Sequence, residues 1–403
     1  MGNILGDSVP GDGVRKAAIQ HFFTAASWIE GAATQQLSDV ATLTDMISVA
    51  GFPDLHPGKY GPVGMTALCH RLYPQLIGND IGCGMSFFEL DLPLRKFRID
   101  KAADQLRKLE DIDLPSQADR LLELGMPADF FVDSLGTIGG GNQFCEIQAV
   151  ADIIDPEAEN LVDRQRLYLL VHSGSRGLGA AVFRETLEDY GFLANGIEVG
   201  TEAAVAWLLS HNAAVEWASV NRQMIAERAA AALRADVRMI ADVPHNLVRI
   251  TGDGIVHYKG AAAIGDGVIA PIAGSRATLS HLVKALAGAE TTHWGISHGA
   301  GRKYDRKAMH GRTGGTRSER DALRTNDWGG LAICDDRNLL IEEAASAYKD
   351  AGKVVADLAS FGLVQPLATM KPLVTYKTAQ PDRIERERSK DRDRTTTRRM
   401  RHG

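Results

Sequence analysis

The sequence predicts an α/β protein, because segments typical of strands alternate with segments typical of helices. Leu167–Val171 is short and wholly apolar, as expected of a strand buried on both faces. Phe87–Leu92 also reads as a strand. Glu202–Arg234 is rich in alanine and has Trp207 and Trp217 among its apolar positions, which indicates a long helix. A length of 403 residues fits two or three domains, or one large α/β domain.

The first half of the chain combines expected helices with glycine-rich turns. We expect helices over Leu37–Ala50, Lys96–Glu110 and Ser116–Leu124. Phe52–Gly64 holds so many Pro and Gly residues that we expect no regular element there. Because it carries an Asp, a His and a Lys, it is a candidate binding loop, with a plain connector as the equal alternative. Three glycines at 139–141 lead into a further expected strand.

The second half is predicted to continue with a hairpin, a linker, a helix and a tail. Leu247–Thr251 and Ile255–Gly260 are expected strands, joined by a turn with the Asp-Gly pair that favours hairpins. Lys303–Arg324 is polar, basic and dotted with glycine, so we expect a mobile loop or linker. Ile341–Ala359 is an expected helix. Residues 382–403 carry alternating charges and are expected to form a solvated or disordered tail.

Bulk composition points to a cytoplasmic protein. No apolar run is long enough to span a bilayer, and the N-terminus lacks the pattern of a secretory signal. Four cysteines without a Cys-x-x-Cys pair argue against a disulfide framework. The net charge is −6, and residues 382–403 hold nine basic against five acidic side chains, a balance of +4 that leaves −10 for the rest. A polyanionic partner would therefore have to meet local basic patches.

Four residues in glycine-rich, proline-rich or serine-rich turns are candidate metal ligands. Asp80 and Cys83 lie three residues apart in the glycine-framed turn GNDIGCGM, and His172 and His245 lie in similar turns at the edges of apolar segments. A carboxylate, a thiolate and imidazoles together suit Mn, Fe, Co or Zn better than Mg or Ca. The alternative is a buried structural cysteine with turn histidines that only form hydrogen bonds.

His298 is a candidate nucleophile. It lies in Ser-His-Gly-Ala-Gly-Arg, where small residues allow a phosphate to approach backbone N–H groups and Arg302 can pair with that phosphate. A neutral imidazole can attack phosphorus and pass the acquired group on. A general base or a simple loop histidine is the equal alternative. The chain has no P-loop and no well-placed dinucleotide fingerprint, so a nucleotide would bind in another way.

Nine segments taken in order resemble the RtcB family of RNA ligases. They read PDLHPGKYGPVG, GNDIGCGM, LGTIGGGNQFCEI, VHSGSRGLG, VPHNLV, HYKGA, GSRATLS, SHGAGR and AYKD. The resemblance extends over about Phe52 to Lys377 and implies an RtcB-type α/β fold, with mixed sheets and surrounding helices around a central metal and GTP pocket. It implies a single catalytic domain over residues 1–381. It also implies a GTP- and Mn(II)-dependent ligase that joins 3′-phosphate or 2′,3′-cyclic phosphate RNA ends to 5′-hydroxyl ends.

The resemblance further implies roles for individual residues. His298 would be the histidine that GTP guanylates before GMP passes to the RNA 3′-phosphate. Cys83 would bridge two metal ions, His172 and His245 would complete the first ion's ligands, and Asp80 would bind the second ion. The positions that it assigns to GTP or GMP are Asn142, Glu146, His245, Asn246, Ala273, Gly274, Ser275, Arg276, Ser280, His298, Gly299, Ala300, Gly301, Tyr348 and Lys377. Glu146 suits guanine N–H groups, and Tyr348 would stack on or flank the base.

The chain departs from the family pattern at three places. Gln143 stands where the family has a histidine ligand of the second metal, and a neutral amide is a poorer ligand for such an ion. Arg276 replaces an apolar residue, and the segment Lys371–Thr378 lacks the usual ending of the family. That ending resembles a divergent branch associated with release factor H, which implies a release-factor-like partner and RNA with broken ends, tRNA or rRNA, as substrate.

Two other functions remain open from the sequence. The loss of a metal-ligand histidine at Gln143 favours a one-metal RNA 3′-end phosphodiesterase or cyclic-phosphate hydrolase on the same scaffold. A non-catalytic relative that binds RNA or ribosomes is the third reading. The basic segment Lys303–Arg324 and the tail are candidates for contacts with RNA phosphates, with a merely solvated role as the equal alternative.

Overall fold

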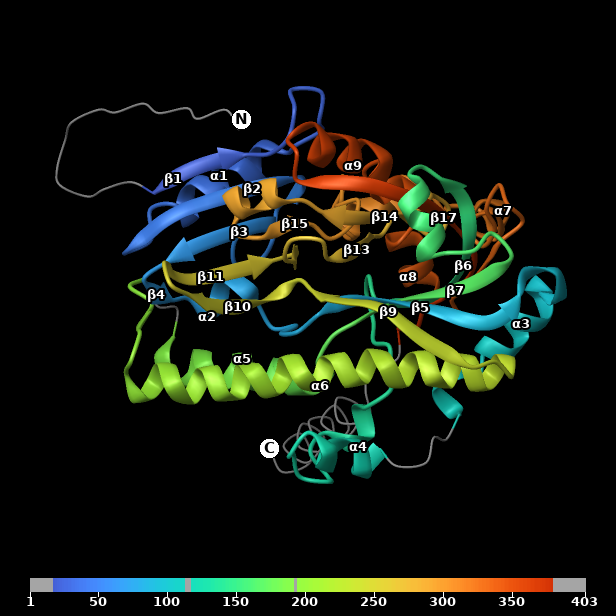
Figure 1. Ribbon diagram of the computed structural model, residues 1–403, viewed down its shortest axis with the longest axis horizontal. Coiled ribbons are helices and arrows are strands. Elements are labelled where there is room, and N and C mark those ends of the chain that lie inside the picture. Colours follow the sequence, from blue (N-terminus) through green and yellow to red (C-terminus); the bar gives the residue numbers. More distant parts are fainter. Residues whose placement is uncertain (1–16, 113–116, 192–193, 380–403) are drawn as a thin grey trace, which may run out of the picture.

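Two large β-sheets form the frame of the computed structural model, which describes residues 17–112, 117–191 and 194–379 (Figure 1). The first sheet has five strands in the order β1 (Ala18–His21), β2 (Met46–His56), β3 (Val63–Cys69), β11 (Gly254–Lys259) and β10 (Asn246–Thr251). The strands β10 and β11 form the hairpin that the Asp-Gly pair predicts.

The second sheet has eight strands and carries the candidate site residues Glu146, His172 and Ser280. Its strands follow the order β13 (Ile269–Ile272), β14 (Ser280–Ala285), β17 (Val364–Tyr376), β6 (Phe144–Ile153), β7 (Arg166–Ser173), β5 (Gly84–Pro93) and β9 (Val237–Pro244), with β16 (Leu331–Ile333) beside β17. The strands expected from Phe87–Leu92 and Leu167–Val171 are β5 and β7, and the strand expected after the three glycines is β6.

Two short ribbons complete the strands. They are β12 (Ala261–Ala263) with β15 (Gly295–Ser297), and β4 (Arg71–Leu72) with β8 (Ile197–Glu198). Most neighbouring strands are antiparallel, but β1 pairs with β2, and β16 with β17, in parallel. The predicted α/β class with mixed sheets and surrounding helices is therefore confirmed.

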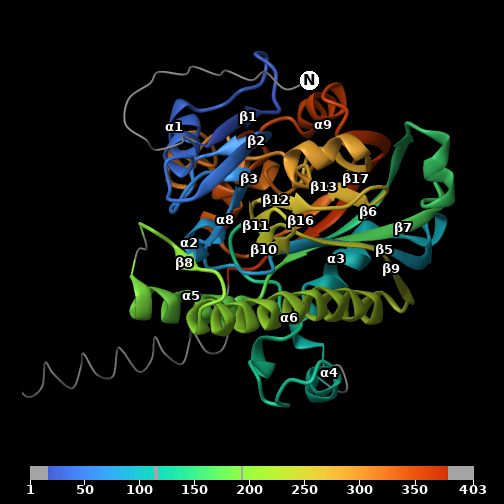
Figure 2. The ribbon, with the colours of Figure 1, turned by 60° about the vertical axis from the view of Figure 1, so that its left-hand side comes forward.

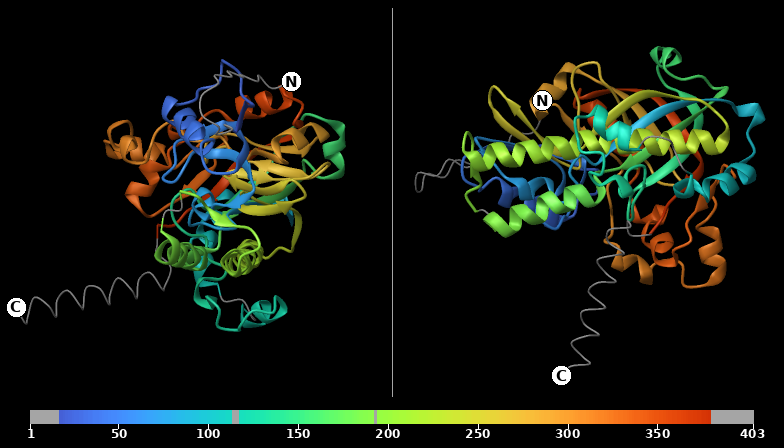
Figure 3. Two further views of the ribbon diagram at one scale, coloured as in Figure 1. Left: turned by 90° about the vertical axis from the view of Figure 1, so that its left-hand side faces the viewer. Right: turned by 90° about the horizontal axis from the view of Figure 1, so that it is seen from below.

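Helices surround the two sheets (Figure 1). They are α1 (Gly31–Val40), α2 (Pro74–Ile77), α3 (Ile99–Leu106), α4 (Gln117–Glu123), α5 (Arg176–Tyr190), α6 (Glu202–Leu233), α7 (Arg317–Ala322), α8 (Arg337–Glu342) and α9 (Ala351–Ser360). Helix α6 crosses β5, β7 and β9, and Figure 2 and the right-hand view of Figure 3 show it passing along that sheet with α5 beside it. Helix α4 lies on the far side of α6 from the sheets (Figure 1). Helix α9 packs on β17, β14 and β2.

Helix α6 forms where its sequence predicts a helix. The side chain of Thr201 caps its first turn by accepting a hydrogen bond from the backbone N–H of Ala204. Its many alanines favour helix and permit close packing, while Trp207 and Trp217 are buried. The helix ends where Arg234 adopts the left-handed conformation.

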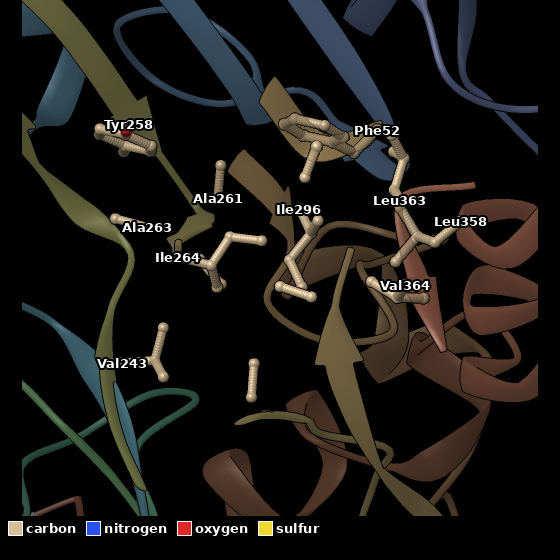
Figure 4. Close-up of a cluster of buried hydrophobic side chains, with 14 of the residues drawn as sticks. Phe52, Val243, Tyr258, Ala261, Ala263, Ile264, Ile296, Leu358, Leu363 and Val364 are labelled. Atoms are coloured by element: carbon tan, nitrogen blue, oxygen red, sulfur yellow. The ribbon is translucent and has the colours of Figure 1, made fainter. Parts of the chain in front are cut away.

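One hydrophobic cluster joins the two sheets. Figure 4 shows Phe52 of β2 and Tyr258 of β11 from the first sheet near Ile296 of β15, with Val243 of β9 and Val364 of β17 from the second. All of these side chains are buried. Burial of apolar area at about 25 cal/mol per Å² makes such a shared core the main force that holds the sheets together.

Two expectations for the first 64 residues are wrong. The helix expected over Leu37–Ala50 is instead α1, which ends at Val40, and the chain enters β2 at Met46 after Asp45 adopts a left-handed conformation. Phe52–Gly64 is not free of regular structure, because β2 continues to His56 and β3 begins at Val63. An irregularity in the β2–β3 pairing between Gly51 and His56 accommodates the proline.

Two expectations for the C-terminal third are also wrong. Lys303–Arg324 is not a structureless linker, since it holds a 3₁₀ helix at Lys307–Gly311 and helix α7, and Met309 is buried against Ile341. The single helix expected over Ile341–Ala359 is divided into α8, a 3₁₀ turn at Ala345–Ala347 and α9. Asp350 starts α9 as a side-chain cap, and so breaks the apparent continuity.

The remaining expectations concern two helices, the charged tail and membrane-spanning segments. The expected helices over 96–110 and 116–124 correspond to α3 and α4, although Ser116 lies outside the described residues, as does the charged tail at 382–403. In the part of the chain that the structure describes, no helix has both the length and the apolar content needed to cross a membrane.

Candidate metal and nucleotide site

The ends of three adjacent strands bring a thiol and two imidazoles together. Gly84, at the start of β5, pairs with Ser173 of β7 on one side and with Pro244 of β9 on the other. His172 directly precedes Ser173, and His245 directly follows Pro244. Cys83 directly precedes Gly84. Its Sγ lies 3.2 Å from Nε2 of His172, which lies 3.3 Å from Nε2 of His245. The candidate ligand atoms of the three residues all lie within 4.8 Å of one another.

The protonation of these groups suits metal binding. Burial lowers the pKa of His172 to about 3 and that of His245 well below its usual value, so both rings are neutral at pH 7. Nδ1 of His172 lies 3.2 Å from the carbonyl oxygen of Asn142. If Nδ1 carries the proton and donates it there, Nε2 keeps its lone pair. Nδ1 of His245 has no hydrogen-bond partner among the described residues.

The donor set fits a borderline divalent cation. Two neutral imidazole nitrogens only 3.3 Å apart can share at most one proton between them, whereas a cation between them would satisfy both lone pairs. Burial and the nearby Asp80 carboxylate raise the pKa of the Cys83 thiol well above its usual value. A metal ion would reverse this effect by binding the thiolate. The geometry thus supports the predicted role of Cys83, His172 and His245 as ligands.

Asp80 lies beside this cluster but is engaged by other groups. Its Oδ2 accepts a hydrogen bond of 2.7 Å from Nε2 of Gln143. The amide oxygen of Gln143 in turn accepts from Arg176, at 3.3 Å. The amide of Gln143 therefore bridges the carboxylate and a guanidinium.

A buried arginine of α6 braces the segments that carry the cluster. Arg222 donates to the carbonyl oxygens of Gly82 at 2.8 Å and Ser173 at 3.1 Å, which are the neighbours of Cys83 and His172 in sequence. It also forms an ion pair of 2.7 Å with Asp242 of β9, the strand that leads to His245. One side chain thus ties all three ligand-bearing segments together.

The turn before β5 approaches its neighbours too closely for side chains. A Cβ atom at Gly82, where φ is 73°, would lie 2.8 Å from the Cα atom of Val215 in α6. A Cβ atom at Gly84 would lie 2.8 Å from the Cα atom of Pro244. Glycine is therefore required at both positions for the turn to reach its place.

His298 lies next to the cluster with one ring nitrogen fixed. Its ring centroid is 4.4 Å from that of His245 and 6.4 Å from that of His172. Its Nδ1 lies 2.6 Å from the carbonyl oxygen of Gly260 and 3.0 Å from Oδ2 of Asp54. With Nδ1 engaged in this way, Nε2 is the nitrogen available to the cavity.

Asp54 is fully buried and is held in place from several sides. Its oxygens accept hydrogen bonds from the hydroxyl of Ser297 at 2.8 Å and from the backbone N–H of His298 at 3.3 Å. Burial alone would raise the pKa of Asp54, but the His298 and Ser297 hydrogen bonds and the Lys349 charge lower it overall. Lys349 also donates to the carbonyl oxygens of Pro53 and Leu55 and so fixes the strand around this carboxylate.

A cavity of about 460 Å³ contains these groups, and its size is typical of small-molecule sites. Every residue predicted to hold a metal or a nucleotide lines this cavity. Its other polar and charged side chains are those of His56, Lys59, Asn79, Lys259, Arg302, Asp305, Arg306, Glu343 and Thr375. The abundance of cations suits a phosphate-bearing ligand.

Glu146 is the buried carboxyl group on the β6 side of the cavity. Burial raises its pKa to about 7, although hydrogen bonds from Thr375 and Gln148 and the charge of Lys377 oppose the rise. Gln148 also donates to Ser280, which connects β6 with β14. Such an acceptor suits the N–H donors of a purine edge.

Two of the predicted nucleotide-binding side chains are engaged with protein groups. Asn246 donates to the carbonyl oxygen of Asp80 and accepts from the backbone N–H of Gly260. The buried guanidinium of Arg276 donates to three carbonyl oxygens, those of Leu323, Leu340 and Glu343. Both residues line the cavity, and their contact with a nucleotide remains a prediction.

Three residues that matter for this geometry were not singled out from the sequence. Asp54 appeared only as part of the candidate loop Phe52–Gly64. Arg222 lies in a helix that was expected only to support the fold, and a charged residue at a helix position facing the sheet is the signal that marks it. Glu343 follows another acidic residue at the end of α8 and shows no distinguishing signal.

Comparison with known proteins agrees with this architecture. The family model described as "RtcB: tRNA-splicing ligase RtcB" matches residues 36–124 and 127–378. The chain is 40% identical to the RNA-splicing ligase RtcB2 of Escherichia coli, over 89% of this chain and 96% of that protein. It is 26% identical to the RNA-splicing ligase RtcB homolog 2 of Entamoeba dispar, over 85% and 83%. It is 25% identical to the RNA-splicing ligase RtcB of Mycobacterium tuberculosis, over 85% and 100%.

The fold and the site define an α/β protein in which a buried Cys/His/His cluster and an oriented histidine share one polar cavity. The comparisons then identify the family: the chain belongs to the RtcB family of RNA ligases.

Proposed function

We propose that the protein is a GTP- and Mn(II)-dependent RNA ligase that joins a 3′-phosphate or 2′,3′-cyclic phosphate end to a 5′-hydroxyl end. The observation that carries this proposal is the orientation of His298. Its Nδ1 is held by Asp54 and the Gly260 carbonyl, and its ring lies beside His245 in the same cavity as the Cys/His/His cluster. A nucleophile with one nitrogen fixed and the other free is what attack on phosphorus requires.

The proposed reaction has three steps at His298 and the RNA ends. Nε2 of His298 attacks the α-phosphorus of GTP, so that a P–N bond forms and pyrophosphate leaves. An oxygen of the RNA 3′-phosphate then attacks that phosphorus, which frees the imidazole and activates the RNA end. Finally the 5′-hydroxyl attacks the activated phosphate, forms the phosphodiester and releases GMP. A cyclic phosphate end first takes up one water.

The side chains around His298 have matching tasks. Asp54 stabilises the positive charge that develops on the ring during attack, and it orients the ring before attack. A divalent cation at Cys83, His172 and His245 supplies neutralisation of the negative charge on phosphate oxygens. Glu146 accepts hydrogen bonds from guanine, Tyr348 flanks the base, and Lys377 lines the same wall.

Mapping of a covalent adduct tests this proposal. Incubation with GTP and Mn(II) is expected to add the mass of one GMP to the protein, and peptide mapping is expected to place it on His298. His298→Ala should abolish the adduct. His310→Ala changes an exposed histidine that pairs with Glu342, and should leave the adduct unchanged. Absence of any adduct with several divalent metals would contradict the proposal, and RNA binding without turnover would favour the non-catalytic reading.

A second candidate function has one observation in its favour. Because Gln143 bridges Asp80 and Arg176, the Asp80 carboxylate is already engaged, and a second cation there would have to displace the amide. A site with one cation suits a phosphodiesterase or cyclic-phosphate hydrolase that acts on RNA 3′ ends.

Metal counting and a GTP-free assay separate the two functions. Under the second function, the wild-type protein binds one Mn(II), opens a 2′,3′-cyclic phosphate end of RNA to a monophosphate without GTP and does not ligate, and Gln143→His raises the stoichiometry to two and creates ligation. Under the first function, ligation occurs in the wild-type protein and depends on GTP. Broken tRNA or rRNA as substrate, a release-factor-like partner and a cytoplasmic location remain predictions from the sequence.

A further inference from the structure

Glu343 is a buried carboxylate at which several walls of the cavity meet. It directly follows α8, and its side chain is 2% exposed. Its Oε1 lies 3.0 Å from a guanidinium nitrogen of Arg302 and 3.3 Å from Nε of Arg306. Its Oε2 accepts a hydrogen bond from the hydroxyl of Tyr348 and lies 3.8 Å from Nζ of Lys377.

The partners of Glu343 come from several segments, and all except Tyr348 are more than 30 residues away in the sequence. Arg302 and Arg306 follow the His298 loop, Tyr348 lies between α8 and α9, and Lys377 follows β17. The carbonyl oxygen of Glu343 accepts a further hydrogen bond of 2.9 Å from Arg276, in the loop before β14. This single residue therefore connects four segments that line the cavity.

The negative charge of Glu343 offsets the positive charges of the side chains around it. Burial alone would raise its pKa, but Lys377, Arg302 and Arg306 lower it to about 2, so it is ionised at neutral pH. Three cations converge on it. Without this carboxylate they would repel one another in a poorly solvated wall, and Lys377 and Arg302 would move apart.

Two of the partners are residues that the proposed function assigns to GTP. The ring of Tyr348 has the Arg302 guanidinium 5.2 Å from its centroid, and its hydroxyl is anchored on Glu343. Lys377 is held between Glu343 and the carbonyl oxygen of Gln143, to which it donates at 3.0 Å. A neutral amide here would offer one acceptor oxygen in place of two, would remove the negative charge that attracts Lys377, and would place an added donor among donors.

We propose that Glu343 is a positioning residue of the nucleotide pocket, whose carboxylate holds the Tyr348 hydroxyl and the Lys377 ammonium in the orientation in which they meet GTP. It acts through those two side chains. This inference rests on the proposed function in one respect, namely that the ligand is GTP.

The chain offers a matched control at the preceding position. Glu342 is also an acidic residue at the end of α8, but its carboxylate pairs with the exposed His310 at 3.0 Å. Glu342→Gln therefore removes one charge from the same helix end without changing the groups around Tyr348 and Lys377.

The test compares Glu343→Gln with Glu342→Gln in the full-length protein. Calorimetric titration with GTP is expected to give a dissociation constant at least about tenfold higher for Glu343→Gln, as for the loss of a charged hydrogen-bond network, and an unchanged value for Glu342→Gln. The rate of His298 adduct formation at saturating GTP should stay within about threefold of wild type. Mn(II) stoichiometry should be unchanged, which separates positioning from loss of the fold.

A double variant shows whether the effect passes through Tyr348. Tyr348→Phe and Glu343→Gln together should weaken GTP binding less than the product of their separate effects. Fully multiplicative effects in this pair and in the corresponding pair with Lys377→Met would overturn the inference. So would a GTP dissociation constant for Glu343→Gln within twofold of the Glu342→Gln value.

Crystal structures keep the inference testable if the proposed function fails. If the wild-type protein binds no GTP, the structures of the wild type and Glu343→Gln decide the matter. Displacement of Tyr348 and Lys377 in the variant, with Cys83 and His298 in place, supports positioning by Glu343. Unchanged positions of both side chains overturn it.

Discussion

Glu146 is a carboxyl group whose ionisation is opposed by its surroundings. Its pKa is raised to about 7 because burial outweighs the hydrogen bonds from Thr375 at 2.5 Å and Gln148 at 2.7 Å. Only the ionised form can accept from two guanine N–H groups at once. The affinity for GTP should therefore depend on pH near neutrality.

We expect GTP binding to weaken as the pH falls below about 7. Binding selects the ionised carboxylate, so the dissociation constant should rise by close to tenfold for each pH unit on the acid side and level off above pH 8. Calorimetric titrations between pH 5.5 and 8.5 measure this. In Glu146→Gln the affinity should be lower and its dependence on pH largely lost, and equal wild-type affinities at pH 5.5 and 8.5 would contradict the assignment.

The same residue makes a prediction about stability. The native pKa of about 7 lies above the ordinary value of 4.5, so the native state loses stability as the pH rises through this interval. The loss approaches about 3 kcal/mol above pH 7 by the relation of 1.36 kcal/mol per pKa unit. Glu146→Gln should therefore raise the unfolding free energy at pH 8 relative to wild type and have little effect at pH 5, as measured by denaturant unfolding.

At the scale of elements, α6 is the part that aligns the three ligand-bearing segments. Arg222 reaches from this helix to the neighbours of Cys83 and His172 and to Asp242 on the strand that leads to His245. Groups behind metal ligands commonly change metal affinity by about 10–100-fold when they are altered. The helix should therefore influence the metal site without contributing a ligand.

We expect Arg222→Lys to weaken Mn(II) binding by about 10–100-fold, because a lysine cannot hold both carbonyls and Asp242 together. Arg228→Lys is the control, since Arg228 is another buried arginine of α6 and donates to the carbonyl oxygen of Gly136. That change should lower the melting temperature and leave Mn(II) affinity within about threefold. Equal Mn(II) affinities for the two variants would contradict the role of Arg222 in holding the ligand-bearing segments in place.

Helices and strands were predictable from the sequence where the local pattern of residues favours one structure. The alanine-rich α6 and the apolar β7 were predictable for this reason, as was the Asp-Gly hairpin. The continuation of β2 through Pro53 was not, because Lys349 supports the carbonyls there from almost 300 positions away in the chain. The regular structure within residues 303–324 depends on the burial of Met309 against α8, and no local sequence pattern reveals this contact.

At the scale of the whole molecule, the site is made by contacts between distant segments. Asp54 meets His298, and Lys377 meets Gln143, across more than half of the chain. Turn composition and family motifs singled out the residues that line the cavity. They could not reveal Asp54 as the partner of His298, nor Glu343 as the partner of two arginines, because each pairing joins segments that are distant in the sequence.

A metal ion at the cluster should stabilise the whole fold. It would join the ends of β5 and β7 to the link between β9 and β10, so it binds only the native arrangement. At a concentration 100 times the dissociation constant, such binding adds about 2.7 kcal/mol to the unfolding free energy. We expect Mn(II) to raise the melting temperature and a chelator to lower it, while Cys83→Ser should melt alike in both.

The lack of a side chain at Gly82 has a mechanical consequence. With only hydrogen on its Cα atom, Gly82 lies almost directly against the backbone of α6 at Val215, with no side chain of its own between them. Helix α6 has 32 residues and is about 48 Å long, and the residue that touches it here directly precedes Cys83. A tilt of this helix would therefore shift the Cys83 thiol relative to the imidazoles of His172 and His245.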